Sequence, residues 1–139
     1  MAKILLIEDH QDSRDLIRIV LEIDEHTVVE VATAEEGLRL AKQFNPELII
    51  MDISLAGEID GLEATRRLRC DAAFDRTVIF ALTAHAMKND EDMILAAGCD
   101  KYFTKPIVDF EVFRQEIAKA LVRGRDGGGG DNTNNQVQP

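Results

Sequence analysis

Short apolar runs alternate with amphipathic stretches along most of the chain. Runs of this length suit strands that are buried on both faces, and they are too short for ordinary helices. The stretches between them place apolar residues at helical spacing and fill the opposite side with charged residues. The pattern predicts strands at 4–7, 27–32, 47–52, 77–82 and 101–104. It predicts helices at about 12–22, 33–44, from 61 onwards, 86–97 and 109–122.

Local signals mark several helix ends. Thr33 and Glu36 have the spacing of a capping box, so the second helix should start there. Asn45–Pro46 should stop that helix, and Gly98 suits the end of the fourth. The expected buried positions are Leu16, Ile17, Val20 and Leu21 in the first helix, Leu62, Thr65 and Leu68 in the third, and Phe110, Phe113, Ile117 and Leu121 in the fifth.

Five strands that alternate with five helices predict an α/β fold, a single doubly wound parallel sheet covered on both faces. We expect residues 1–123 to form one domain. Residues 124–139 include four consecutive glycines at 127–130, and the remainder is polar. Such a segment offers too little apolar surface to offset the entropy of ordering, so we predict a disordered tail.

Composition narrows the classes of function. The net charge of −10 argues against a nucleic-acid surface, which needs clustered Lys and Arg. Cys70 and Cys99 are too few for a zinc site, and we interpret both as free thiols in a reducing compartment. We find neither a signal-peptide core nor a run of membrane-spanning length, so we expect a cytoplasmic protein with no membrane partner.

Reactive side chains follow four of the five predicted strands. Glu8-Asp9, Asp52, Thr83 and Lys105 stand at the strand ends. In a parallel sheet these ends share one edge, where such folds bind ligands. Carboxylates crowded together repel one another, and a hard divalent cation relieves that repulsion. The sequence therefore predicts a Mg²⁺ site at this edge.

A cation, a lysine and a hydroxyl together form an apparatus for phosphoryl chemistry. Mg²⁺, Lys105 and Thr83 would neutralise the oxygens of a phosphoryl group during transfer. Asp52 is the expected nucleophile, because a carboxylate can form an acyl phosphate.

The chain resembles the receiver domain of two-component response regulators over nearly all of residues 2–122. The stretch from Thr83 to Ile107 looks most like receivers of hybrid kinases and stand-alone phosphorelay receivers. The resemblance implies a (βα)5, flavodoxin-like fold with strand order 2-1-3-4-5. It rests on Glu8-Asp9, Asp52, Asp60-Gly61, Thr83-Ala84, Gly98 and Lys105-Pro106.

The same resemblance implies a role for each matching residue. Asp52 would be the phosphoacceptor, and Asp9 and Asp52 would bind Mg²⁺ directly. The Ser54 carbonyl would complete the metal site, with Glu8 acting through water. Contacts to the phosphoryl group would come from Lys105, Thr83 and the backbone N–H of Ala84. Lys105–Pro106 would be a cis peptide bond, and Tyr102 would be the aromatic switch residue that turns inward on activation.

Partners are also implied by the resemblance. A sensor histidine kinase or a histidine phosphotransfer protein would donate the phosphoryl group. It would dock near Arg14, Leu16 and Arg18 and near the Pro106 loop. A downstream protein target would read the face made by the fourth helix, the fifth strand and the fifth helix.

One departure from the family pattern lies after the phosphoacceptor. Ala56 stands where a proline is usual, and the loop to Asp60 has one extra residue. Two alternatives stay open: a Mg²⁺-dependent phosphatase with an aspartyl nucleophile, and a receiver-like module that binds partners without phosphorylation. Ser54 argues against the phosphatase, because such enzymes usually place a second Asp there. Intact Asp9, Asp52 and Lys105 argue against the binding module.

The three histidines are the remaining candidates for chemistry. We find no carboxylate at triad spacing for His10, His26 or His85, so solvent exposure is the expectation for each. His85 lies two residues past Thr83, where it could influence attack of water on the phosphoryl group.

Overall fold

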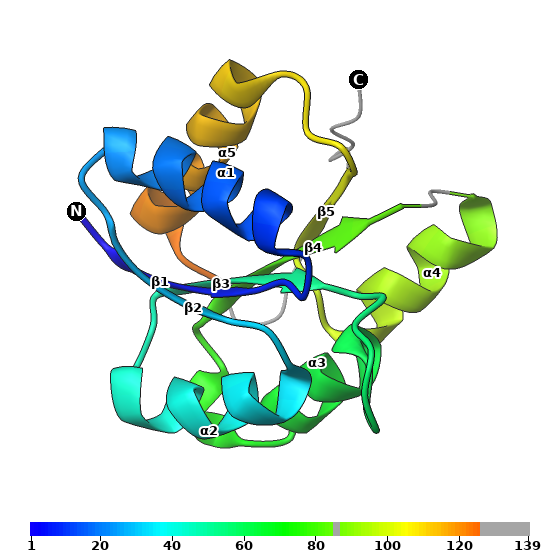
Figure 1. Cartoon of the computed structure of the whole chain (residues 1–139). Helices are drawn as coiled ribbons and strands as arrows, with labels where there is room; N and C mark the ends of the chain where they lie inside the picture. The colour runs from blue at the N-terminus through cyan, green and yellow to red at the C-terminus, as the bar shows by residue number, and fades with distance from the viewer. Residues whose placement is uncertain (85–86, 126–139) are drawn as a thin grey trace.

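The computed structural model describes residues 1–84 and 87–125. A five-stranded parallel sheet lies between two layers of helices in this part of the chain (Figure 1). The first half contains β1 (Lys3–Ile7), α1 (Gln11–Ile23), β2 (Thr27–Val31), α2 (Ala34–Phe44) and β3 (Leu48–Asp52). The second half contains α3 (Gly61–Arg69), a 3₁₀ turn (Ala72–Phe74), β4 (Val78–Thr83), α4 (Lys88–Ala97), β5 (Lys101–Thr104) and α5 (Phe110–Arg123).

The strands lie in the order β2-β1-β3-β4-β5, all parallel, so the predicted doubly wound α/β fold and its 2-1-3-4-5 order are confirmed. β1 and β3 are neighbours, and successive strands are added outward from them on opposite sides: β2 beside β1, and β4 and β5 beyond β3. In doubly wound folds the ligand crevice opens outside the carboxyl ends of the strands at such a point. The reactive strand ends Glu8-Asp9 and Asp52 therefore flank the expected crevice.

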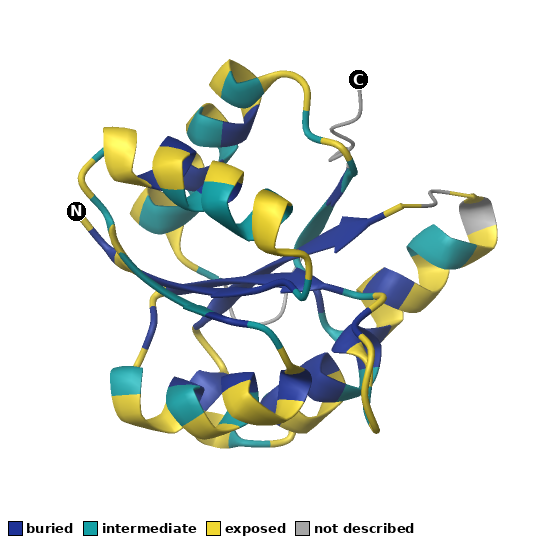
Figure 2. Ribbon diagram, viewed as in Figure 1, coloured by how far each residue is buried: buried dark blue, intermediate teal, exposed yellow. Residues whose placement is uncertain are grey.

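Two separate cores form because the central strands bury alternate side chains on opposite faces. α1 and α5 cover one face, and α2, α3 and α4 cover the other (Figure 1). All five residues of β3 and all six of β4 are buried, and Figure 2 shows the dark band they make through the centre. The short apolar runs of β1, β3 and β4 were therefore correctly interpreted as buried strands, whereas β2 and β5 at the two edges of the sheet are mostly half-buried.

Capping residues set several helix starts. The Thr33 side chain accepts a hydrogen bond from the Glu36 N–H at the start of α2, as the capping box predicts. Asp60 does the same for α3 by accepting from the Glu63 N–H at 2.9 Å. α4 ends at Gly98, whose φ of 116° is favourable only for glycine. Local sequence thus accounts for where these helices begin or end.

Some predicted burial is wrong. Leu16 is 46% exposed, and the buried stripe of α1 consists of Ile17, Val20 and Leu21. Leu16 is adjacent to Ile17 in sequence, so it lies about 100° around the helix, beyond the edge of the buried face. Leu62, Thr65 and Leu68 are buried as predicted. In α5, Phe113 and Ile117 are buried, whereas Phe110 and Leu121 are only half-buried.

Several predictions fall outside the described residues, namely the start of the fourth helix at Ala86, the role of His85, and the tail from residue 126 onwards. α5 ends at Arg123, and Arg125 beyond it still donates to Asp100 at 2.7 Å, so the domain boundary after residue 123 stays a prediction. Among the described helices, none combines the length and apolar character that crossing a bilayer requires.

Candidate functional site

The register of the sheet brings the reactive residues to one edge. Asp52 is the last residue of β3 and pairs with Leu82 of β4, one residue before Thr83. Thr83 pairs in turn with Thr104, the last residue of β5, and Lys105 follows directly. Glu8 follows β1, whose last residue Ile7 pairs with Met51. Sequence reasoning predicted this gathering from parallel topology alone.

Lys105 lies between two buried carboxylates. Its Nζ is 3.3 Å from Asp52 Oδ2 and 3.3 Å from Glu8 Oε1. Glu8 is fully buried and Asp52 is 1% exposed, whereas the Lys105 side chain is 19% exposed. A single ammonium group thus faces two desolvated acids, and one positive charge cannot neutralise both.

The pKa shifts follow from this imbalance. Burial raises the pKa of Glu8, and the Asp52 charge adds to the rise against the lowering effect of the His10 N–H and Lys105. Burial acts to lower the pKa of Lys105, but the charges of Asp52 and Glu8 outweigh it, so the pKa is raised. Lys105 therefore stays cationic, while burial favours the protonated form of Glu8.

Asp9 lies at the mouth of this group, with its side chain 24% exposed. Its Oδ2 accepts from the Ala56 N–H at 3.3 Å, so the lengthened loop after β3 reaches back to it. The same loop is held next to the strand, where the Ser54 N–H donates to Asp52 Oδ1 at 3.0 Å. Asp9 Oδ1 is buried and has no hydrogen-bond partner among the described residues. A buried carboxylate oxygen that accepts no hydrogen bond is a suitable ligand for a cation.

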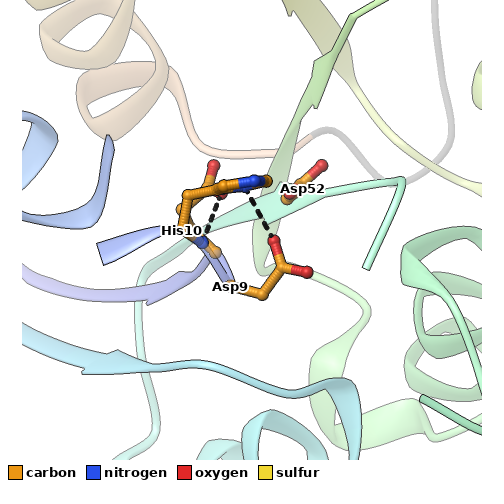
Figure 3. A group of neighbouring side chains, drawn as sticks. Asp9, His10 and Asp52 are labelled. Carbon is orange, nitrogen blue, oxygen red and sulfur yellow. Dashed lines mark hydrogen bonds and ion pairs between the residues drawn. The ribbon is translucent and has the colours of Figure 1, made fainter. Parts of the chain in front are cut away.

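His10 belongs to the site, although sequence reasoning left it without a partner. Its ring is 73% exposed as predicted, but Nδ1 lies 3.2 Å from Asp9 Oδ1 and 3.4 Å from Glu8 Oε2. Figure 3 shows the ring turned toward Asp9 and Asp52. The available signal was adjacency, because His10 directly follows Glu8-Asp9 in the sequence.

The residues present fit a divalent cation. Ligand atoms of Glu8, Asp9, His10 and Asp52 all lie within 4.8 Å of one another. Three carboxylates are the donors that Mg²⁺ prefers, and Asp9 Oδ1, which is buried and accepts no hydrogen bond from the described residues, is suited to bind such an ion. Bound there, Mg²⁺ would offset the excess negative charge that Lys105 leaves. The predicted ligand role of the Ser54 carbonyl stays a prediction.

Thr83 and the Lys105–Pro106 segment complete the edge. Thr83 is buried, Ala84 after it is exposed, and the Thr83 carbonyl accepts from the Lys105 N–H at 2.8 Å. The Lys105–Pro106 peptide bond is cis, the isomer that the resemblance implies. The Ala84 N–H contact to a phosphoryl group stays a prediction.

Tyr102 is half-buried on β5, and its hydroxyl donates to Glu91 of α4 at 2.6 Å. Burial, together with this bond and the Glu91 charge, raises the pKa of Tyr102 to about 12. Sequence reasoning named Tyr102 but missed Glu91, since no local pattern links residues eleven positions apart on different elements. The switch role of Tyr102 stays a prediction.

His26 is the other histidine that the structure describes, and it has a partner. His26 is half-buried, and its Nδ1 accepts from the Ala2 N–H at 3.0 Å, so the expectation of a solvent-exposed His26 is wrong.

The two arginines predicted to take part in donor docking have partners within the domain. Arg14 donates to the Glu8 carbonyl and contacts Glu30, which also contacts Arg18. These arginines are thereby held against β2.

Comparison with known proteins gives a consistent result. The sequence profile of the response regulator receiver domain matches residues 4–118. The polar-differentiation response regulator DivK of Brucella ovis is 36% identical over 104 residues, which cover 75% of this chain and 84% of that protein.

Solved structures show the same similarity. A LuxR-family two-component response regulator from Aurantimonas sp. SI85-9A1 has a TM-score of 0.78 and 32% identity, covering 90% of this chain and 88% of that one. The chemotaxis protein CheY4 of Vibrio cholerae has a TM-score of 0.79 at 23% identity, covering 86% of this chain and 98% of that one, which shows likeness of fold alone.

Proposed function

The chain belongs to the response regulator receiver family, and on that premise we propose that it accepts a phosphoryl group onto Asp52 in a Mg²⁺-dependent reaction. The donor is the phosphohistidine of a sensor kinase or of a phosphotransfer protein. One observation supports this above others: Lys105 Nζ lies 3.3 Å from Asp52 Oδ2 at the strand edge where Glu8 and Asp9 also lie.

The transfer forms a bond between one Asp52 carboxylate oxygen and phosphorus, and it breaks the phosphorus–nitrogen bond of the donor. The electron pair of the broken bond returns to the donor imidazole. Lys105 faces the Asp52 carboxylate and is positioned to bind an oxygen of the transferred group. Thr83 and the Ala84 N–H are the further contacts we assign to that group.

Asp9 and Asp52, with Glu8 through water and the Ser54 carbonyl, are the groups we assign to the metal. When bound, Mg²⁺ supplies positive charge against the phosphoryl oxygens. Asp9 Oδ1 supports this assignment, because it is buried and accepts no hydrogen bond from the described residues. The product is a signalling state, so we expect no rapid turnover of external substrates.

We assign donor docking to the outer face of α1. Leu16 is 46% exposed there, and it points about 200° around the helix from Arg14 and Arg18, which are half-buried. An exposed apolar side chain on a helix face suits the core of a protein interface. The Pro106 loop is the second part of this docking surface. We also propose that the reaction takes place in the cytoplasm.

We assign output to the face of α4, β5 and α5. The Tyr102–Glu91 hydrogen bond joins β5 to α4 on this face, so movement of Thr83 and Tyr102 would change how α4 is held. A downstream protein with different affinity for the two arrangements would then read the phosphorylation state.

Incubation with acetyl phosphate and Mg²⁺, followed by intact mass measurement, tests the proposal. We expect a gain of one phosphoryl group that Asp52→Asn and EDTA each abolish. Asp12→Asn, which removes an exposed charge at the start of α1, should retain the gain. No gain from either acetyl phosphate or a phosphohistidine donor would contradict the proposal, and rapid hydrolysis of p-nitrophenyl phosphate would favour a phosphatase.

A further inference from the structure

His10 is a nitrogen donor placed among the oxygen donors of the metal site. Its Nδ1 lies 3.2 Å from Asp9 Oδ1 and 3.4 Å from Glu8 Oε2. The His10 backbone N–H donates to Glu8 Oε2 at 3.0 Å, which fixes the backbone from which the ring projects. The ring itself is 73% exposed, so it can turn about its side-chain bonds without moving the acids.

The spacing of these atoms suits one coordination shell. Two ligand atoms at right angles on an ion with bonds of about 2.1 Å lie roughly 3 Å apart. The 3.2 Å between His10 Nδ1 and Asp9 Oδ1 is close to such an edge. The same Asp9 oxygen is buried and has no hydrogen-bond partner among the described residues, so its closest polar contact on the site side is the His10 nitrogen that would share the ion with it.

An imidazole changes which cations the site prefers. Mg²⁺ takes oxygen ligands and keeps several waters, so a nitrogen donor adds little to its binding. Imidazole suits the later divalent ions of the first transition row, and affinity rises along that row from Mn²⁺. A site of three carboxylates and one imidazole is therefore a site for transition metals as well as for Mg²⁺.

We propose that His10 Nδ1 is a direct metal ligand beside Asp9 and Asp52, so that this receiver site selects Mn²⁺ and later transition ions over Mg²⁺. The inference rests on the proposed metal-dependent function and adds an order of affinity among the divalent ions that the site can bind. His10 must bind through its unprotonated Nδ1, so any proton on that atom leaves to solvent when the ion binds.

Pulsed EPR of bound Mn²⁺ tests the ligand directly, because a coordinated imidazole gives a ¹⁴N coupling that carboxylates and water cannot give. We expect this coupling in the wild type and its loss in His10→Asn. His26→Asn and His85→Asn remove the other two histidines of the chain and should retain it. Bound Mn²⁺ without ¹⁴N coupling, or a coupling lost in His85→Asn instead, would overturn the proposal.

Affinity gives a second measurement. His10→Asn should weaken Mn²⁺ binding by about tenfold or more, whereas Mg²⁺ affinity should change much less. If His10→Asn lowered the affinity for both ions equally, or raised it for both, His10 would affect only access to the acids and would not be a metal ligand.

Phosphorylation by acetyl phosphate, followed by intact mass on the same samples, separates the two proposals. If the protein is phosphorylated on Asp52 but its bound Mn²⁺ shows no nitrogen coupling, only the His10 inference is contradicted. If the coupling is present but the protein is not phosphorylated, only the proposed function is contradicted. A protein that is phosphorylated with Mg²⁺ but binds no Mn²⁺ also contradicts only the His10 inference.

Discussion

Single side chains in this protein act through partners that lie far away in the sequence. Lys105 faces Glu8 across 97 positions and Asp52 across 53. Tyr102 depends on Glu91, and its pKa of about 12 results from burial and from that acid. The chemistry of each residue is therefore set by the element that packs against it.

Titration of Tyr102 measures this dependence directly, because it is the only tyrosine and the chain has no tryptophan. We expect half-ionisation near pH 12 in the folded protein, against about 10 for an unperturbed tyrosine. A raised folded pKa means that this contribution to stability is complete below pH 10 and is lost as pH rises through about 12. Ultraviolet absorbance of the phenolate follows the ionisation.

Glu91→Gln should lower that pKa, because it removes the negative charge beside the hydroxyl while keeping an acceptor. Glu35→Gln, an exposed position on α2, should leave the titration unchanged. An unchanged pKa in Glu91→Gln would show that Glu91 does not hold the hydroxyl in solution.

At the scale of elements, the loop between β3 and α3 fixes the site. Gly61 opens α3 directly beneath the strand end, where its N–H donates to the Ile53 carbonyl at 3.3 Å. A Cβ at Gly61 would overlap the Asp52 carbonyl oxygen and lie 2.6 Å from Ile53 Cα, and both are backbone atoms. Glycine here lets the helix approach the strand that presents Asp52.

Gly61→Ala should therefore destabilise the protein by about 2 kcal/mol, since packed backbone must move to admit the methyl group. It should also slow phosphorylation of Asp52, because the displaced atoms belong to that residue and the next. Gly124→Ala is the control for crowding: nothing lies within 4 Å of its Cβ, and only its backbone, with φ of 68° and ψ of −176°, opposes alanine, at about 1–3 kcal/mol. Chemical denaturation and intact mass provide the measurements, and equal phosphorylation rates in both variants would contradict the argument.

At the scale of the whole molecule, the two ends of the sheet differ in charge balance: the acid at one end is paired with cations, whereas the acids at the other end are in excess. At the amino-terminal end of β4 and β5, Asp100 accepts from Arg69, Arg125 and the Ile79 N–H, so the chain beyond α5 is tied to the sheet. At the carboxyl-terminal edge, the acids outnumber the cation that faces them. A ligand that supplies positive charge should therefore bind at the second end and stabilise the fold.

Mg²⁺ should raise the free energy of unfolding by about 2.7 kcal/mol at a concentration one hundred times its dissociation constant. Asp9→Asn should lose most of this gain, because the substitution removes a charged ligand, and Asp12→Asn should retain it. Thermal unfolding with Mg²⁺ or EDTA, at ionic strength matched with KCl, measures the difference. An equal response in the two variants would mean that the cation acts only by screening the net charge.

The sequence by itself determined the elements and the edge at which the chemistry lies. Runs such as 48–52 become strands because both faces are apolar, and Thr33 and Asp60 cap helices through contacts within three residues. Parallel topology then brings Asp52, Thr83 and Lys105 together without knowledge of any contact. The strand order came from family resemblance, since no local pattern states which strands pair.

Only the tertiary structure decided the contacts between elements. It exposed Leu16, turned His10 toward the buried Oδ1 of Asp9 and joined Tyr102 to Glu91. Such features depend on how helices pack on the sheet, and residues near one another in space need share no sequence signal. The metal preference inferred for the site is therefore a property of packing, although the residues concerned are visible in the sequence.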